Sequence, residues 1–173
     1  MPSTPTRSRL RRHLQELALI LVGLMVLSTA VDWWRRPSQP ASAAALTMHD
    51  LQQQPLSLAE LSRETPVLLY FWGSWCGICR HTSPAIDRLA ADGVPVVSIA
   101  LQSGDDATVA AYLAQHGYRF RTVNDADGHI AQQWAVTVTP TIVLLQDGRI
   151  RHHTSGLSSY WGLKARWWWA ARF

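Results

Sequence analysis

The chain is poor in cysteine and in charge: its 173 residues include only two cysteines, and only 16% are charged. It therefore has little capacity for disulfide cross-links. Cys76 and Cys79 are separated by two residues, so a disulfide between them would close a very short loop. Stabilisation by loop closure grows with loop length, and such a bridge would constrain the unfolded chain little. The lack of a second cysteine pair also excludes a four-cysteine zinc site. The pair is therefore predicted to carry out chemistry.

Carboxylates are absent from residues 148–173, which carry five cations. Residues 37–147 have ten carboxylates and five Arg, so residues 37–173 are neutral as a whole. The net charge of +4 therefore belongs to residues 1–36, which hold six Arg against two acidic residues. This confinement to one end argues against nucleic-acid binding by the folded part. The total length suits one domain with a tail of roughly thirty to forty residues.

One long apolar run, Leu17–Val31, lies near the N-terminus and contains no charge. With Leu14 and the pair Trp33-Trp34 it reaches about twenty residues, or roughly 30 Å of helix, which matches a bilayer core. Four Arg precede the run and two follow it, a bias that places the N-terminus in the cytoplasm. We predict a basic cytoplasmic tail, a single-pass inner-membrane anchor, a linker and a periplasmic domain, over residues 1–13, 14–34, 35–45 and 46–173 respectively.

Two alternatives for this segment are weaker. A cleaved signal peptide would use Ala41-Ser42-Ala43, but this site lies well beyond the apolar run, where a peptidase site normally follows closely. A buried core helix is disfavoured by the four Arg that precede the run.

After residue 46, strand patterns alternate with helical ones, which predicts an α/β sandwich with a mixed sheet. The Asp147-Gly148 pair predicts a hairpin between the last two strands. The predicted strands are Val67–Trp72, Pro95–Leu101, Phe120–Val123, Thr141–Leu145 and Ile150–Thr154. The predicted helices are Cys76–Ala91, Asp106–His116, Ile130–Trp134 and one that follows Gly156.

The cysteine pair follows a predicted strand directly and opens a predicted helix. Unpaired N–H groups and the macrodipole at a helix N-terminus favour an anion, so Cys76 is expected to have a lowered thiol pKa and to act as the nucleophile. Cys79, one turn later and more buried, is placed to attack the mixed disulfide that Cys76 forms with a partner. Cys76 and Cys79 are therefore the predicted catalytic redox pair.

The stretch YFWGSWCGICRHTSP resembles the active site of the thioredoxin superfamily. Pro84 matches the proline that kinks the active-site helix of that family, and Thr139-Pro140 matches its cis-proline loop, which faces the cysteines. The resemblance implies a thioredoxin fold, with a mixed central sheet flanked by helices. It also implies protein disulfide oxidoreductase activity without an organic cofactor, and a substrate-binding surface that includes Trp75, Thr139 and Pro140.

Further segments resemble one branch of this superfamily. Residues 127–150 are similar to the membrane-anchored TlpA-like proteins, and SGDDATVAAYL, VNDADG, VTPTIV and SGLSSYWGLKARWWWA resemble the ScsD-like (suppressor of copper sensitivity) protein disulfide oxidoreductases. This implies protein thiol or disulfide clients and electrons from a membrane relay of the DsbD type. Thr139 before the proline is shared with several reducing or isomerising members and favours a reductant. Where thioredoxin has a buried Asp, this chain has Tyr70, so the proton of Cys79 must pass to water or another group.

A copper-binding or copper-delivery module is the alternative function. The same cysteines would need a nearby histidine, such as His81, His152 or His153, because thiolates and imidazoles suit Cu(I). The cysteine spacing fits the redox interpretation better, and we predict no metal site.

The tryptophans divide by position. Trp72 and Trp134 are predicted to lie in the core and Trp75 to be exposed beside the nucleophile. In the last helix, Trp161 and Trp168 share a face that could pack on the sheet. The run 167–169 covers too many directions for one stripe, so at least one tryptophan is predicted outside the core, where it could contact a membrane interface.

Overall fold

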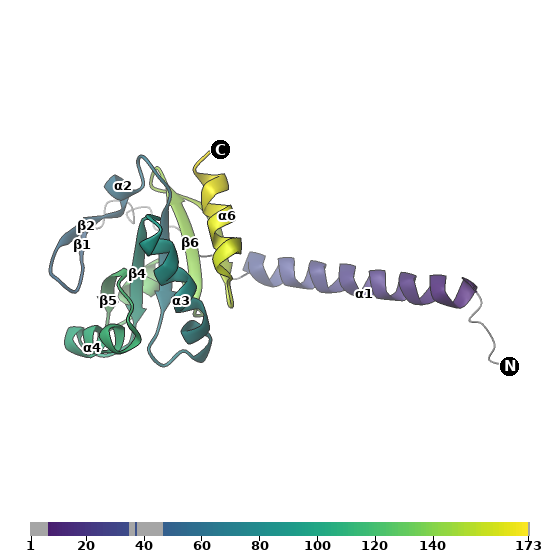
Figure 1. Cartoon of the computed structure of the whole chain (residues 1–173), viewed down its shortest axis with the longest axis horizontal. Helices are drawn as coiled ribbons and strands as arrows, with labels where there is room; N and C mark the ends of the chain where they lie inside the picture. Colours follow the sequence, from purple (N-terminus) through teal and green to yellow (C-terminus); the bar gives the residue numbers. More distant parts are fainter. Residues whose placement is uncertain (1–6, 35–36, 38–46, 173) are drawn as a thin grey trace. The chain divides into compact units, whose positions relative to one another are not determined.

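A computed structural model describes residues 7–34, 37 and 47–172 (Figure 1). These fall into two units, 1–35 and 36–173, and each is described by itself. The first contains helix α1, Arg7–Trp34, which includes the residues of the predicted anchor, 14–34. Within the described ranges, no helix combines the length and apolar character needed to cross a membrane. The predicted linker, apart from Pro37, and the alternative cleavage site lie outside the described residues.

The second unit is built on a five-stranded mixed sheet in the order β5-β4-β3-β6-β7. Strands β3, β4 and β5 are parallel to one another, whereas β6 runs antiparallel to both β3 and β7. The strands span β3 Val67–Trp72, β4 Val96–Leu101, β5 Arg121–Asp125, β6 Thr141–Gln146 and β7 Arg149–Ser155. A separate small hairpin pairs β1 Thr47–His49 with β2 Pro55–Ser57.

The helices of this unit cover both faces of the sheet. Their bounds are α2 Leu58–Leu61, α3 Gly77–Ala91, α4 Asp106–His116, α5 His129–Gln133 and α6 Tyr160–Ala170. Helices α3, α4 and α6 contribute to the core on one face, and Figure 1 shows α3 and α6 side by side there. The β1–β2 hairpin, α2 and α5 supply the core on the other face.

Strand β3 explains why two cores form. All six of its residues are buried, and because successive strand side chains point to opposite faces, they divide alternately between the two clusters. Leu68, Tyr70 and Trp72 face the α3 side, whereas Leu69 and Phe71, with Val67, face the α5 side. A continuous apolar run of this kind is typical of a central strand covered on both faces.

The thioredoxin fold with a mixed sheet is confirmed, and every predicted strand and helix after residue 66 is present within a few residues of its predicted bounds. Trp72 and Trp134 are fully buried as predicted. The β1–β2 hairpin and α2 were not predicted, because three- and four-residue elements carry too little periodicity.

The proposed packing face of the last helix is wrong. Trp161 is 71% exposed and Trp168 is 46% exposed, whereas Tyr160, Leu163 and Ala170 face the core. A shift of two residues, about 200° around the helix, is enough to reverse a helix face. The alanine and glycine beside the tryptophans leave that phase undetermined by hydrophobicity alone.

Candidate active site

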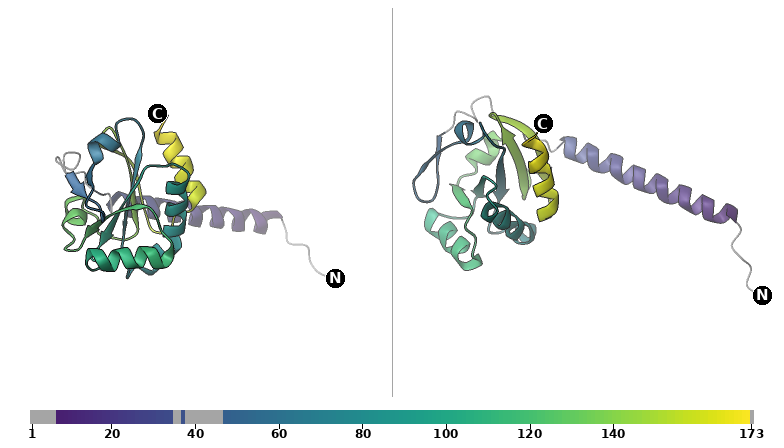
Figure 2. Two further views of the ribbon diagram at one scale, coloured as in Figure 1. Left: turned by 60° about the vertical axis from the view of Figure 1, so that its left-hand side comes forward. Right: turned by 45° about the horizontal axis from the view of Figure 1, so that its top comes forward.

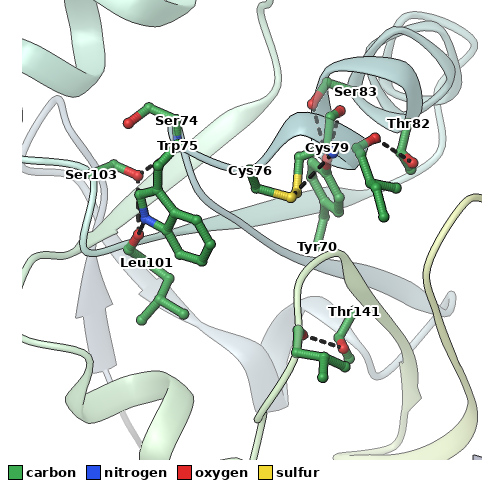
Figure 3. Close-up of a disulfide and its surroundings, with 12 residues drawn as sticks. Tyr70, Ser74, Trp75, Cys76, Cys79, Thr82, Ser83, Leu101, Ser103 and Thr141 are labelled. Atoms are coloured by element: carbon green, nitrogen blue, oxygen red, sulfur yellow. Dashed lines mark hydrogen bonds between the residues drawn. A yellow bond between two sulfur atoms is a disulfide. The ribbon is translucent and has the colours of Figure 1, made fainter.

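The cysteine pair lies where the central strand passes into the long helix α3. Strand β3 ends at Trp72, a short loop follows, and Cys76 is the N-cap residue of α3 with an extended backbone conformation. The backbone N–H of Cys76 donates to the Gly73 carbonyl across this turn, at 3.0 Å. Cys76 and Cys79 form a disulfide, so the described state is the oxidised one (Figure 3).

The start of α3 favours negative charge on Cys76. The backbone N–H of Cys79 donates to the Cys76 sulfur at 3.2 Å, in the position of a side-chain N-cap. The first turn of the helix contains no acidic residue that would oppose the macrodipole. In the reduced protein these groups would stabilise the thiolate of Cys76 more than its thiol.

The two cysteine residues differ in access. Cys76 is 6% exposed and Cys79 only 1%, so a partner reaches the first cysteine more readily than the second. The side chains beside them are open, with Trp75 57% exposed and Ile78 51% exposed. The site is a nearly buried disulfide flanked by an exposed apolar rim.

Trp75 is held in a defined position. Its indole N–H donates to the Leu101 carbonyl at 3.1 Å, and the neighbouring Ser74 N–H donates to Ser103 Oγ at 2.9 Å (Figure 3). The ring lies so close to Gly73 that a Cβ there would be 2.6 Å from Trp75 Cε2. Leu101 and Ser103 were missed in the sequence, because their contacts cross 26 to 29 residues and leave no local pattern.

The Thr139-Pro140 loop reaches the same end of the sheet. Thr141 of β6 is paired with Phe71 of β3, so Pro140 lies level with the end of β3, from which the cysteine loop departs. The peptide bond before Pro140 is cis, as the resemblance implied. Thr141 Oγ1 donates to the Val138 carbonyl at 2.8 Å and ties the loop to the start of β6. Trp75, Thr139 and Pro140 therefore come from segments that converge at the cysteine end of the sheet.

Tyr70 lies on the inner side of the cysteine pair and is fully buried. Its hydroxyl donates to the Cys79 carbonyl at 3.3 Å and shares a 2.9 Å hydrogen bond with Ser83 Oγ (Figure 3). Burial raises the pKa of Tyr70, so its hydroxyl stays neutral around pH 7. The residue ties β3 to the first turns of α3, and its hydroxyl contacts a carbonyl and another hydroxyl rather than a sulfur.

The copper alternative finds no support in the geometry. Within the part of the chain that the structure describes, no three His, Cys, Asp or Glu side chains are grouped so that they could hold a metal ion. His81 lies on α3, whereas His152 and His153 lie on β7.

Comparison with known proteins bears on the same site. The AhpC/TSA family matches residues 38–153, more than half of the chain. The chain belongs to the AhpC/TSA family. Its relatives include a thioredoxin-like protein of Haemophilus influenzae, 46% identical over 165 residues that cover 95% of this chain and 99% of the relative. They also include the thiol:disulfide interchange protein DsbE of Xylella fastidiosa (strain 9a5c), 32% identical over 149 residues, or 80% of this chain and 74% of the relative.

A solved structure has a similar fold. The crystal structure of a secreted Mycobacterium tuberculosis disulfide oxidoreductase homologous to E. coli DsbE has a TM-score of 0.63 and 26% identity, covering 73% of this chain and 96% of that chain. With its Cys76–Cys79 pair at the start of α3, this AhpC/TSA family member is a thiol-disulfide oxidoreductase of the thioredoxin type. Its assignment to the TlpA-like, ScsD-like branch stays a prediction.

Proposed function

We propose that this oxidoreductase reduces disulfides in client proteins, with Cys76 as the attacking thiolate and Cys79 as the resolving thiol. The observation that carries this assignment is the N-cap position of Cys76, whose sulfur accepts the Cys79 N–H at the positive end of α3. The exposures of 6% for Cys76 and 1% for Cys79 support the same order of attack. A thiolate that is both stabilised and the more accessible of the two is the one that meets a partner disulfide first.

The cycle balances in two steps. The Cys76 thiolate attacks one sulfur of the client disulfide, which forms a mixed disulfide and releases the other client sulfur as a thiolate. Cys79, once deprotonated, attacks the Cys76 sulfur, which closes the Cys76–Cys79 disulfide and releases the second client sulfur. Two electrons pass to the client, and its two thiolates take up protons. A membrane thiol-disulfide relay of the DsbD type would return two electrons to the cysteine pair.

Client recognition is assigned to the exposed rim and the proline loop. The indole of Trp75 is fixed by its hydrogen bond to Leu101, so it offers apolar area without first losing side-chain freedom. The Thr139-Pro140 loop lies at the same end of the sheet as the cysteines and supplies backbone groups for an extended client segment. This arrangement supports Trp75, Thr139 and Pro140 as the substrate-binding residues.

The direction of electron flow is testable through the reduction potential of the cysteine pair. The reducing direction is supported by the Thr139-Pro140 sequence, which resembles reducing and isomerising members of the superfamily. Equilibration of the full chain with glutathione, read by the fraction of disulfide, should give a potential near that of thioredoxin, about −270 mV. A potential near the strong oxidants, about −120 mV, would contradict the reducing direction.

The location belongs to the proposal as well. We propose that α1 holds the chain in the inner membrane with the oxidoreductase unit in the periplasm, on the strength of the basic N-terminus and the apolar side chains that α1 exposes within its own unit. Alkaline carbonate extraction should leave the full chain in the membrane pellet and release a chain that lacks residues 1–36. Release of the full chain as well would contradict an anchor.

A further inference from the structure

The end of the oxidoreductase unit carries cations that the redox chemistry does not use. Arg151 on β7 and Arg166 on α6 are exposed, and no carboxylate lies within ion-pair distance of either in the described part of the chain. Residues 148–173 contain no acidic side chain that could neutralise them locally. Lys164 is different, because it pairs with Asp92 at 3.1 Å. The region therefore keeps a local positive potential.

Three tryptophans are exposed on the same helix. Trp161 is 71% exposed, Trp169 is 63% exposed and Trp168 is 46% exposed. Arg172 lies over the Trp168 ring, with its guanidinium carbon 4.0 Å from the ring centroid. Trp167 differs, because it is partly buried and its indole N–H donates to the Pro66 carbonyl at 2.7 Å. Helix α6 thus packs one tryptophan inward and presents the others to the outside.

A cavity of about 540 Å³ joins the two sets of residues. Strand β7 contributes Arg151 and His152, and α6 contributes Arg166 and Trp169 together with two alanines. Partial desolvation, and next the positive charge of Arg166, lower the pKa of His152, with a further contribution from His153. The hollow therefore combines two permanent cations with an indole and apolar walls.

We propose that this surface, formed by Arg151, Trp161, Arg166, Trp168 and Trp169 and called here the β7–α6 surface, docks on a bilayer that contains anionic phospholipids. Indole rings favour the headgroup level of a bilayer, where their apolar body and their N–H group are both satisfied. Cations beside them are attracted by the negative potential of anionic lipids. Basic residues combined with tryptophan on an exposed helix are typical of interfacial binding.

An acidic protein partner fits these observations less well. Protein interfaces bury their aromatic residues in a central patch surrounded by a polar rim. Here the exposed tryptophans lie in the first and the last turn of α6, and Arg166 lies between them. This arrangement fits the surface of an anionic bilayer, which is flat and carries charge all along it. The inference does not depend on the direction of the redox reaction or on the role of α1.

The test uses the full chain labelled with 5-fluorotryptophan and mixed with lipid nanodiscs that carry a gadolinium-chelating lipid. Substitution of each of the nine tryptophans by Phe assigns the nine fluorine signals. In discs rich in phosphatidylglycerol, the signals of Trp161, Trp168 and Trp169 should broaden at least threefold more than that of Trp75. Trp75 is the matched control, because it is also exposed but lies at the cysteine end.

Charge dependence supplies the second arm. The α6 tryptophan signals should lose most of their extra broadening in discs of phosphatidylcholine alone. They should lose it likewise in anionic discs when the chain carries Arg151→Gln/Arg166→Gln. The variant Arg63→Gln/Arg119→Gln removes two exposed cations that do not line the cavity, and its α6 signals should keep the extra broadening. Equal broadening of Trp75 and the α6 tryptophans, or equal broadening in neutral and anionic discs, would overturn the proposal.

Two soluble probes separate the other occupants. Glycerol phosphate or polyglutamate, added to the chain in neutral discs, should leave the α6 signals unchanged. Shifts of these signals with glycerol phosphate, without broadening in anionic discs, would overturn bilayer docking in favour of a small-anion site. Shifts of these signals with polyglutamate, without broadening in anionic discs, would overturn bilayer docking in favour of an acidic polypeptide partner.

Discussion

Tyr70 shows how a single residue can replace an expected acid without taking over its chemistry. Its hydroxyl contacts the Cys79 carbonyl and Ser83, and burial raises its pKa, so it cannot act as a base near neutral pH. Its role is to position the first turns of α3 against β3. The proton of Cys79 is therefore expected to pass to water or to another group.

The substitution Tyr70→Phe separates positioning from acid-base chemistry. Loss of the hydroxyl leaves buried partners without their hydrogen bond and should lower the free energy of unfolding by about 1–2 kcal/mol. Urea denaturation monitors this loss. The pH profile of the resolving step, followed by stopped-flow fluorescence, should keep its shape, because no titrating group is removed. A displaced pH profile would show that Tyr70 takes part in proton transfer.

Gly73 controls the position of Trp75. In Gly73→Ala the new Cβ would lie 2.6 Å from the indole, so the ring must move and its hydrogen bond to Leu101 is lost. We expect kcat/KM with a protein client to fall about tenfold, equivalent to about 1.4 kcal/mol of lost binding. Exchange with dithiothreitol, which does not need the rim, should change little.

Gly77→Ala is the matched control for this prediction. Its added Cβ has no neighbour within 4 Å, so Trp75 should keep its place. Near-ultraviolet circular dichroism compares the tryptophan environments of the two variants. An unchanged spectrum and unchanged client kinetics in Gly73→Ala would contradict the positioning of Trp75 by Gly73.

At the scale of elements, the ends of α3 and α6 are joined by one polar cluster. Asp92, the C-cap residue of α3, accepts hydrogen bonds from the Tyr160 hydroxyl and from Lys164 Nζ. The guanidinium of Arg88 lies over the Tyr160 ring, 4.3 Å from its centroid. The hydrogen bonds from Tyr160 and then from Lys164 lower the pKa of Asp92. This cluster fixes the helix that carries the β7–α6 surface to the helix that carries the cysteines.

The lowered pKa of Asp92 predicts an acid-sensitive contribution to stability. Because the folded-state value lies below the unfolded one, the stabilisation is fully present above the unfolded pKa, about 3.9, and is lost as pH falls through the folded pKa. The urea midpoint of wild type should therefore drop more between pH 7 and roughly pH 2.5 than that of Asp92→Asn. Asp147→Asn, in the exposed β6–β7 turn, should retain the wild-type drop. An equal drop in urea midpoint for wild type and for Asp92→Asn would contradict this contribution.

Elements with strong periodicity could be predicted from the sequence, and those fixed by long-range contacts could not. The continuous apolar run of β3 and the capped helix α4, with Asp105 at its N-cap and Gly117 at its C-cap, have local patterns that determine their bounds. The β1–β2 hairpin has none. Its loop is stabilised by Asp50, which is paired with Arg121 across 71 residues at 2.6 Å. The outward face of α6 depends in the same way on Tyr160 meeting Asp92.

The residues of the candidate site also fall into those with a local sequence pattern and those placed by long-range contacts. Cys76 and Cys79 could be recognised in sequence because a strand, a turn and a helix N-terminus are local features, and the cis bond before Pro140 followed from resemblance. Leu101 and Ser103 could not be recognised, because only the parallel pairing of β3 with β4 brings the end of β4 and the loop after it to the cysteines. Local sequence thus identifies the reacting atoms, whereas sheet topology determines the residues that hold the rim.

At the scale of the whole molecule, charge and chemistry are separated along the chain. The cysteine pair lies in a stretch, 37–147, with an excess of carboxylates, whereas the stretches before and after it have an excess of cations. The reacting thiolate depends on the first turn of α3, which has no acidic residue, and not on the overall charge. The basic ends are assigned instead to the proposed anchor and to the β7–α6 surface.

Cys76 and Cys79 are assigned unequal roles within one disulfide, and mixed-disulfide trapping measures this inequality directly. Cys79→Ala should accumulate covalent complexes with client proteins on non-reducing gels, because Cys76 attacks and no resolving thiol remains. Dithiothreitol should release these complexes. Cys76→Ala should trap none, since the buried Cys79 is neither activated nor accessible, and Cys76→Ala/Cys79→Ala gives the background. Equal trapping by the two single variants, or no trapping by Cys79→Ala, would contradict the assignment of Cys76 as the attacking thiolate.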